Sequence, residues 1–448
     1  MKIHKYTGLF VFIIFVILVG SGCEKDGREH IEEVVTDAVN EKQYLGEIAF
    51  RIPWPAYSGR GVAIQKIVEK YNLNNTTDYK ISVVGGDENL SLIHADLLED
   101  TKTMVYLLPY RYVQYFGELG LLEDLTYSKK PYEDYFFEEL WSLATIEDKV
   151  FGVPFLGHAM GLIYNRNLLN QAEVDPASIV DLETLLVALE QIESNTEANG
   201  IGLVGADHND VSWMVNQFIY GFGGQLVDVE GTKVMINSEA SKRALSFYKN
   251  DLGRYAQETW TDDNGEDVMA YFRQGKIAFE IQGPWGITDI WKNQEPFETG
   301  VIPLTDIGIY PEVGPMMISV DQKMDDSMKV AIRPFVEFLI SREGQKLILK
   351  GEYSPEHDRY YPFRLPIRRD MIDRGYMEDY PEFYGFLSGL DQPSVDVPVP
   401  KWQRIKDHYY ESGLHDVMKE KITIEAFLTW IETEGNIVLN DANKGGNK

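Results

Sequence analysis

The sequence predicts an α/β fold built on mixed, mostly parallel sheets. Segments with strand-like and helix-like patterning alternate along the chain, an order typical of strands joined by crossover helices. Some predicted strands are mostly apolar, as at residues 103–108, which indicates burial on both faces. The chain has 448 residues, 44% of them apolar, which is enough for about two or three domains with cores of their own.

The first part of the folded body follows this alternation. Residues 47–53 alternate like a strand, and apolar side chains from Val62 to Tyr71 recur at helical spacing. Strands are expected at residues 80–84 and 103–108, and a helix at residues 111–117.

Helices dominate the remainder of the chain. Asp181 and Ser238 each stand where they can cap a helix. The other expected elements are a helix at 265–274, a strand at 277–281, a helix at 328–340 and a helix at 422–431. Pro334 lies inside the pattern at 328–340, so that helix should be kinked or start late.

Charge and cysteine content exclude several classes of protein. There are 42 Lys+Arg and 71 Asp+Glu, so the formal charge is 42 − 71 = −29. Nucleic acid is therefore not an expected partner, because its binding depends on basic side chains that neutralise phosphates. A single Cys excludes a scaffold held together by disulfides.

The N-terminus has the order of a secretory signal. Lys2 and Lys5 precede an apolar run at residues 9–19, small residues follow at 20–22, and the single cysteine is Cys23. This order resembles a bacterial lipobox, although Gly20 stands where Leu is usual. We expect a signal peptide at residues 1–22, a diacylated Cys23 as membrane anchor, an acidic tether at 23–45 and a folded body from Gly46. A signal peptide followed by an incidental Cys remains the alternative.

Catalytic and cofactor signatures are weak or absent. The sequence has no G-x-S-x-G and no H-E-x-x-H motif. Gly200, Gly202 and Gly205 form G-x-G-x-x-G, but a helix is expected to end just before them, so Gly200 is interpreted as a helix cap and no cofactor is expected. The acidic turn at residues 262–267 has its glycine out of register for an EF-hand and predicts a helix start, and no metal is expected.

Aromatic residues next to predicted turns are the informative feature for function. In open α/β sheets, ligands bind beyond the carboxyl ends of the strands, and flat rings there suit the apolar faces of pyranose sugars. For any single ring, a core or rim contact is the better explanation; the set together favours a carbohydrate site. The candidates are Trp54, Tyr57, Tyr110, Arg111, Trp213, Trp285 and Trp402.

Four segments in order resemble a known family. They are FGVPFLGHAMGLIYNR at 151–166, the segment from Trp213 to Gly224, YFRQGKIAFEIQGPW at 271–285, and VGPMMISV at 313–320 with LPIR at 365–368. Together they are similar to extracellular solute-binding proteins of the maltose-binding type, the receptor lipoproteins of ABC sugar importers. The resemblance covers about residues 46–435.

The resemblance implies a periplasmic-binding-protein-like fold (type II) with two lobes and a cleft between them. By position, lobe one would comprise residues 46–155 and 315–365, and lobe two residues 156–314 and 366–440. The family's sugar-stacking aromatics map onto Trp213, Trp285 and Trp402, all on lobe two. Its polar contacts from lobe one map near Trp54, Tyr110, Arg111 and His158. A buried structural role for His158 stays open.

The resemblance also implies a function. The protein would be no enzyme but a monomeric extracytoplasmic receptor that captures a carbohydrate by hinge closure and presents it to an ABC permease. One alternative is the same fold binding another solute, such as a polyamine, a metal chelate or a phosphate ester, in which case Arg111 would matter more than the rings. The other is a surface glycosidase.

Overall fold

The computed structural model describes residues 42–99, 103–293, 295–354, 357–391 and 395–441. The expected signal peptide, Cys23 and the tether up to residue 41 lie outside the described residues. The first strand, β1 (Gly46–Ile52), begins at the residue where the folded body is expected. Within the described part of the chain, no helix has both the length and the apolar character needed to cross a membrane.

The larger sheet, sheet 1, has six strands. Their order is β14 (Leu365–Pro366), β6 (Val153–Gly157), β11 (Met316–Val320), β3 (Met104–Pro109), β1 and β2 (Tyr79–Gly85). Strands β3, β6 and β11 are buried at every residue, so they form the middle of a core.

The second sheet, sheet 2, has four strands. Their order is β10 (Thr299–Ile302), β7 (Gly161–Asn165), β9 (Ile277–Gln282) and β8 (Asn199–Gly202). The strands of sheet 1 lie within residues 46–157 and 316–366, and those of sheet 2 within residues 161–302. The chain therefore passes from one sheet to the other after β6 and back again before β11. The boundaries given for the two lobes remain a prediction.

The sheets are mixed, and the expectation that they are mostly parallel is wrong. Within the described residues of the two sheets, parallel pairing is limited to β1 with β2 and β3, and to β8 with β9. The pairs β3–β11, β11–β6, β6–β14, β10–β7 and β7–β9 are antiparallel. Four of these five pairs contain β7 or β11, and each of these two strands arrives from the other sheet without an intervening α-helix, so no crossover helix sets a parallel direction.

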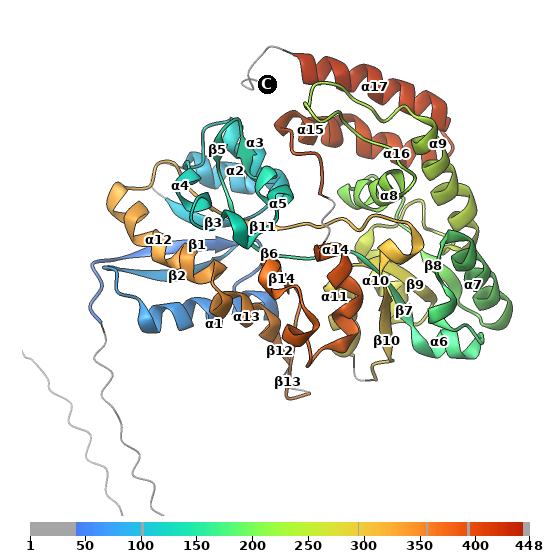
Figure 1. Cartoon of the computed structure of the whole chain (residues 1–448), viewed down its shortest axis with the longest axis horizontal. Helices are drawn as coiled ribbons and strands as arrows, with labels where there is room; N and C mark the ends of the chain where they lie inside the picture. The colour runs from blue at the N-terminus through green and yellow to red at the C-terminus, as the bar shows by residue number, and fades with distance from the viewer. Residues whose placement is uncertain (1–41, 100–102, 294, 355–356, 392–394, 442–448) are drawn as a thin grey trace, which may run out of the picture. The chain divides into compact units, whose positions relative to one another are not determined.

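Helices cover both faces of sheet 1. Figure 1 shows α1 (Gly59–Asn74) and α13 (Arg342–Lys350) below the sheet and α2 (Leu90–Leu98) and α3 (Tyr110–Glu118) above it. The face with α1 and α13 also carries α12 (Asp326–Ile340), which contains Pro334 in its interior, so the alternative of a late start is wrong.

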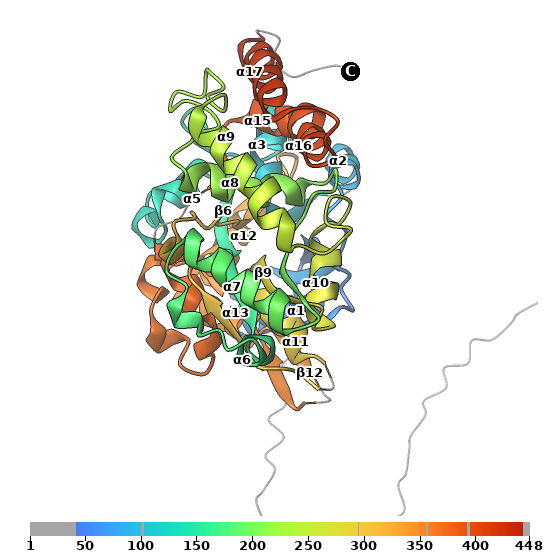
Figure 2. The same ribbon diagram turned by 90° about the vertical axis from the view of Figure 1, so that its right-hand side faces the viewer.

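Sheet 2 has its own helical cover. Contacts with its strands come from α6 (Arg166–Gln171), α7 (Leu182–Asn195) and α10 (Gly265–Arg273), and Figure 2 shows α6 and α7 on the side turned to the viewer. Asp181 caps α7 as predicted, and Asn264 caps α10 in a capping box with Asp267.

The remaining elements are helical with a few short strands. The longer helices are α8 (Asn209–Gly221), α9 (Glu239–Ser246), α11 (Pro284–Trp291), α16 (Glu411–Met418) and α17 (Ile424–Asn440). The shorter ones are α4 (Thr126–Lys129), α5 (Glu138–Ser142), α14 (Leu387–Asp391) and α15 (Pro400–Ile405). Two small hairpins are formed by β4 (Thr145–Ile146) with β5 (Lys149–Val150) and by β12 (Glu352–Ser354) with β13 (Arg359–Tyr361).

Most predicted elements are present within a few residues of their expected bounds, including the helix capped by Ser238. The interpretation of Gly200 as a helix cap is wrong. Helix α7 ends at Asn195, with Thr196 as its C-cap, and Gly200 lies in β8. A Cβ at Gly200 would lie 3.0 Å from the Cβ of Leu189, so the glycine lets the strand pass close to α7.

Candidate functional site

A cluster of rings forms where segments of both sheets meet. From the segments of sheet 1 come Trp54 after β1, His158 after β6, and Phe363 and Arg364 just before β14. Trp285 lies at the start of α11, which follows strand β9 of sheet 2, and Trp213 lies on α8. We define the aromatic cluster as Trp54, His158, Trp213, Trp285, Phe363 and Arg364.

His158 lies between the two indoles of the cluster. Its ring centroid is 4.6 Å from that of Trp285, with the planes at 83°, and 5.8 Å from that of Trp213, with the planes at 37°. The close approach depends on a glycine, because a Cβ at Gly314 would lie 2.5 Å from Cε1 of His158. His158 thus touches rings that come from α8 and α11.

The indole of Trp285 is fixed by its own turn. Its Nε1 donates a hydrogen bond to Oε1 of Gln282 (2.9 Å), the last residue of β9. Pro284 occupies the first position of α11, where its fixed φ favours helix initiation. The ring folds back over Gly283, where any Cβ would lie 2.3 Å from it.

Arg364 covers the other part of the cluster. Its guanidinium carbon lies 4.3 Å from the centroid of Trp285 and 5.9 Å from that of Trp54. Trp54 in turn meets Phe363 edge to face at 5.4 Å. Both distances are typical of cation–π interactions, in which the electron-rich face of an aromatic ring attracts a positive charge.

Several buried polar atoms of the cluster have no hydrogen-bond partner among the described residues. They are both ring nitrogens of His158, Nε1 of Trp213 and Nε of Arg364. Leaving such an atom unpaired costs about 1–3 kcal/mol. Four unpaired atoms gathered around flat rings therefore indicate a place for a ligand that brings its own hydrogen-bonding groups.

Burial sets the charge states of this site. Burial, and to a smaller degree the charge of Arg364, lowers the pKa of His158 well below its ordinary value, so the imidazole is neutral at pH 7. Burial also lowers the pKa of Arg364 to about 9, and the nearby charge of Arg60 acts in the same direction. The guanidinium thus remains mainly cationic at pH 7, in surroundings that oppose its charge.

Arg111 adjoins the cluster, whereas Tyr110 does not face it. The guanidinium of Arg111 donates to Glu88 (2.7 Å) and lies 5.9 Å from the centroid of Trp213. The hydroxyl of Tyr110 donates to Glu312 (2.9 Å) and lies 3.3 Å from a carboxylate oxygen of Asp396.

Trp402 belongs with Tyr110 in a buried polar network. Only 1% of Trp402 is exposed, and its Nε1 donates to Asp396 (3.0 Å). Asp396 also forms an ion pair with Lys406 (2.8 Å), and both side chains are almost fully buried. We define the ionic network as Tyr110, Glu312, Asp396, Trp402 and Lys406.

The predicted site residues therefore fall into three groups. The structure brings Trp54, His158, Trp213 and Trp285 together, with Arg111 beside them. It places Tyr110 and Trp402 in the ionic network, and it leaves Tyr57 on the surface with 89% of its area exposed. Their roles in binding remain predictions.

Sequence reasoning missed Phe363 and Arg364. They directly precede the LPIR segment at 365–368, and β14 carries them to the edge of sheet 1 beside β6. An aromatic residue and a cation next to each other at a strand start were the only signal available.

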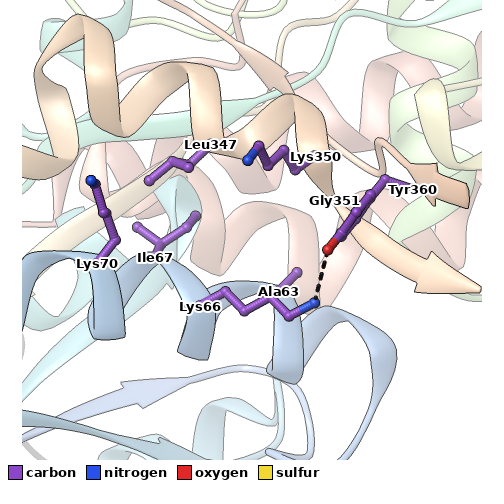
Figure 3. Close-up of a pocket in the computed structure, with 8 residues that line it drawn as sticks. All are labelled: Ala63, Lys66, Ile67, Lys70, Leu347, Lys350, Gly351 and Tyr360. Atoms are coloured by element: carbon purple, nitrogen blue, oxygen red, sulfur yellow. Dashed lines mark hydrogen bonds between the residues drawn. The ribbon is translucent and has the colours of Figure 1, made fainter. Parts of the chain in front are cut away.

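A separate cavity of about 290 Å³ lies between α1, α13 and the β12–β13 hairpin. In Figure 3, the side chains of Lys66, Lys70 and Lys350 lie around those of Ile67 and Leu347. Nζ of Lys66 donates a hydrogen bond to the Tyr360 hydroxyl (3.3 Å). The lining residues are Ala63, Lys66, Ile67, Lys70, Leu347, Lys350, Gly351 and Tyr360, none of them in the aromatic cluster. Among the residues with described positions, no group of three or more His, Cys, Asp or Glu is arranged to hold a metal ion.

Comparison with known proteins identifies the family. The profile of the bacterial extracellular solute-binding proteins matches residues 55–346, more than half of the chain. The chain belongs to this family. This solute-binding protein is 22% identical over 355 residues to a putative binding protein of Brucella abortus, covering 77% of this chain and 81% of the relative. It is 25% identical over 228 residues to the maltodextrin-binding protein MdxE of Bacillus subtilis, covering 50% and 52% of the two chains.

Solved structures agree on the fold of the solute-binding protein. The cyclic α-maltosyl-1,6-maltose binding protein of Arthrobacter globiformis superposes with a TM-score of 0.74 at 17% identity, covering 88% of this chain and 99% of the other. The fold is thus the two-lobed, type II periplasmic-binding-protein-like fold, as the resemblance implies.

Proposed function

We propose that this solute-binding protein captures a carbohydrate at the aromatic cluster and presents it to the permease of an ABC importer. The observation that carries the proposal is the cluster itself, in which flat rings and unpaired buried polar atoms from segments of both sheets face one another. Pyranose rings offer apolar faces to indoles and hydroxyls to the unpaired nitrogens. The named ligands of MdxE and of the Arthrobacter protein are also carbohydrates.

Capture depends on contacts from two sides. Trp54 and Arg364 come from segments of sheet 1, whereas Trp285 follows a strand of sheet 2. A ligand held by both sides favours the closed arrangement, because only there are all its contacts made. The neutral imidazole of His158 can both donate and accept, which suits a hydroxyl.

The proposal is binding without chemistry. Glu88, a carboxylate next to the cluster, is occupied by the ion pair with Arg111. Glycoside hydrolysis needs one carboxylic acid and one carboxylate flanking the bond to be broken. At about −0.3 kcal/mol per heavy atom, a disaccharide of roughly 23 heavy atoms gains about −7 kcal/mol, a dissociation constant on the order of 10 μM.

Replacement of Trp285 tests the site. We expect Trp285→Ala to weaken carbohydrate binding at least tenfold, since it removes a ring of the cluster and the group that orders Gln282. Isothermal titration with maltotriose and a panel of other oligosaccharides measures the effect, and circular dichroism verifies the fold. Trp430→Ala, which removes a partly exposed indole on α17, is the matched control and should bind normally. Equal affinity of folded Trp285→Ala and the unchanged protein would refute the assignment.

We further propose that Cys23 is diacylated and anchors the protein, as a monomer, to a membrane outside the cytoplasm, at the cell surface or in the periplasm. Metabolic labelling with an alkynyl fatty acid should mark the unchanged protein and not Cys23→Ser. Labelling of both would place the lipid elsewhere.

A further inference from the structure

The cations around the aromatic cluster differ in their partners. Arg111 pairs with Glu88 at 2.7 Å, and Arg60 pairs with Glu352 at 3.5 Å. Arg364 has no carboxylate within 4.0 Å among the described residues. Its Nη1 donates a hydrogen bond to the backbone carbonyl of the preceding residue, Phe363 (2.9 Å), and its Nε has no partner among the described residues.

Arg364 is half-buried, with its Nε fully covered, and a cation held partly out of water without a carboxylate partner is costly. Transfer of a charge out of water is unfavourable unless the charge is paired and hydrogen-bonded. The positive charge of Arg60 adds to this cost, and the acids Glu88 and Glu352 offset it only in part, since each is already engaged by another cation. A negative charge brought by a ligand would relieve it.

The position of Arg364 indicates that the missing negative charge belongs to the ligand and not to a separate ion. Its guanidinium lies over Trp285, the ring on which we propose that a sugar stacks, and His158 with two unpaired nitrogens touches the same indole. A planar carboxylate matches the fork of N–H groups on a guanidinium and can take the free Nε together with an adjacent N–H.

We propose that Arg364 makes this site selective for acidic carbohydrates, with a uronate carboxylate as the preferred anion. The inference rests on the proposed function, because it names the class of sugar that the same site takes. Arg364 then acts as the specificity-determining residue, and the rings supply the stacking contacts that neutral and acidic sugars share.

Matched ligands test the proposal. The full mature chain is titrated with di- to tetrasaccharides of galacturonate, glucuronate and mannuronate, and with the same oligosaccharides after reduction of their carboxyl groups to primary alcohols. We expect at least one uronate to bind at least tenfold more tightly than its reduced counterpart, and its affinity to fall with added salt while that of the neutral sugar does not. Equal or tighter binding of every reduced sugar would overturn the proposal.

Matched variants assign the selectivity to the residue. Arg364→Gln should lose at least tenfold in uronate affinity and less than threefold for the neutral counterpart, and Arg364→Lys should lie between. The control is Arg333→Gln, which removes a guanidinium 4.1 Å from the ring of Tyr127, outside the cluster. Unchanged uronate preference in folded Arg364→Gln would overturn the assignment, and Arg364→Lys gives the same test if the Gln variant unfolds.

Other outcomes separate this proposal from the proposed function. Tight binding of neutral sugars without any preference for uronates overturns the selectivity and leaves carbohydrate capture intact. Binding of sulfated oligosaccharides in preference to uronates overturns the choice of anion. Binding of none of these sugars contradicts both proposals.

Discussion

The ion pair between Lys406 and Asp396 gives the sharpest test of the energetics of this fold. Lys406 is fully buried, and its Nζ lies 2.8 Å from Asp396. In Lys406→Met the carboxylate would keep the hydrogen bonds from Trp402 (3.0 Å) and from the amide of Val397 (2.8 Å), but would lose its charged partner. Removing one member of a buried pair costs about 3–5 kcal/mol, because the other charge stays buried without compensation.

Equilibrium urea unfolding measures this loss. At a slope of roughly 3 kcal/mol per molar urea, a loss of about 3–5 kcal/mol lowers the midpoint by about 1–2 M. Lys421→Met is the matched control, since it breaks an exposed pair with Asp416 at the same distance and should cost less than about 1 kcal/mol. Adding Asp396→Asn to Lys406→Met should recover part of the loss. Midpoints for Lys406→Met and Lys421→Met that agree would refute the reasoning.

Three further changes probe other parts of the molecule. Burial and the neighbouring charge of Asp396 raise the pKa of Glu312 to about 8. The stability that this group contributes is therefore complete below about pH 4.5 and is lost as the pH rises through 8. Glu312→Gln should flatten the decline of the unfolding free energy between pH 5 and 8, and an unchanged slope would contradict this. Burial raises the pKa of Glu280 well above its ordinary value, and neither of its carboxylate oxygens has a partner among the described residues. In thermal melting at pH 8, Glu280→Gln should therefore be at least as stable as the unchanged protein, and marked destabilisation would point to an unrecognised partner. Asn264→Ala removes the cap of α10 and should cost about 1 kcal/mol in urea unfolding, whereas no change would mean that Asp267 alone orders the turn.

Local patterns predicted the elements because their causes are local. The apolar spacing of α1 and the alternation of β1 depend on side chains within one element, and both are present. Pairing direction depends on where the chain returns from, which is why the antiparallel partners of β6 were not foreseen. Gly200 was assigned to a helix end because a glycine that follows a helix looks the same whether it caps that helix or enters the next strand.

The site was predictable only as a set of ring positions. Trp213 and Trp285 both contact His158 in the structure, and glycines at 283 and 314 allow the close packing of Trp285 and His158. The two tryptophans were visible in the sequence as rings near predicted turns. The same signal also selected Tyr57 and Trp402, since neighbours in sequence do not determine which way a ring faces. Arg364 was missed because a single cation carries no periodicity, and its lack of a carboxylate partner appears only in three dimensions.

The order of strands in sheet 1 has a consequence for biosynthesis. Strand β11 lies between β6 and β3 in the sheet. A nascent chain that has reached Gly157 therefore contains β1, β2, β3 and β6 but lacks β11, which joins β6 to the other three strands. That strand ends at Val320, which is 320 − 157 = 163 residues later. At about 5–20 residues per second, the ribosome needs roughly 8–30 s to supply it. The first third of the chain, up to Gly157, therefore waits with one edge of β3 unpaired until β11 is made.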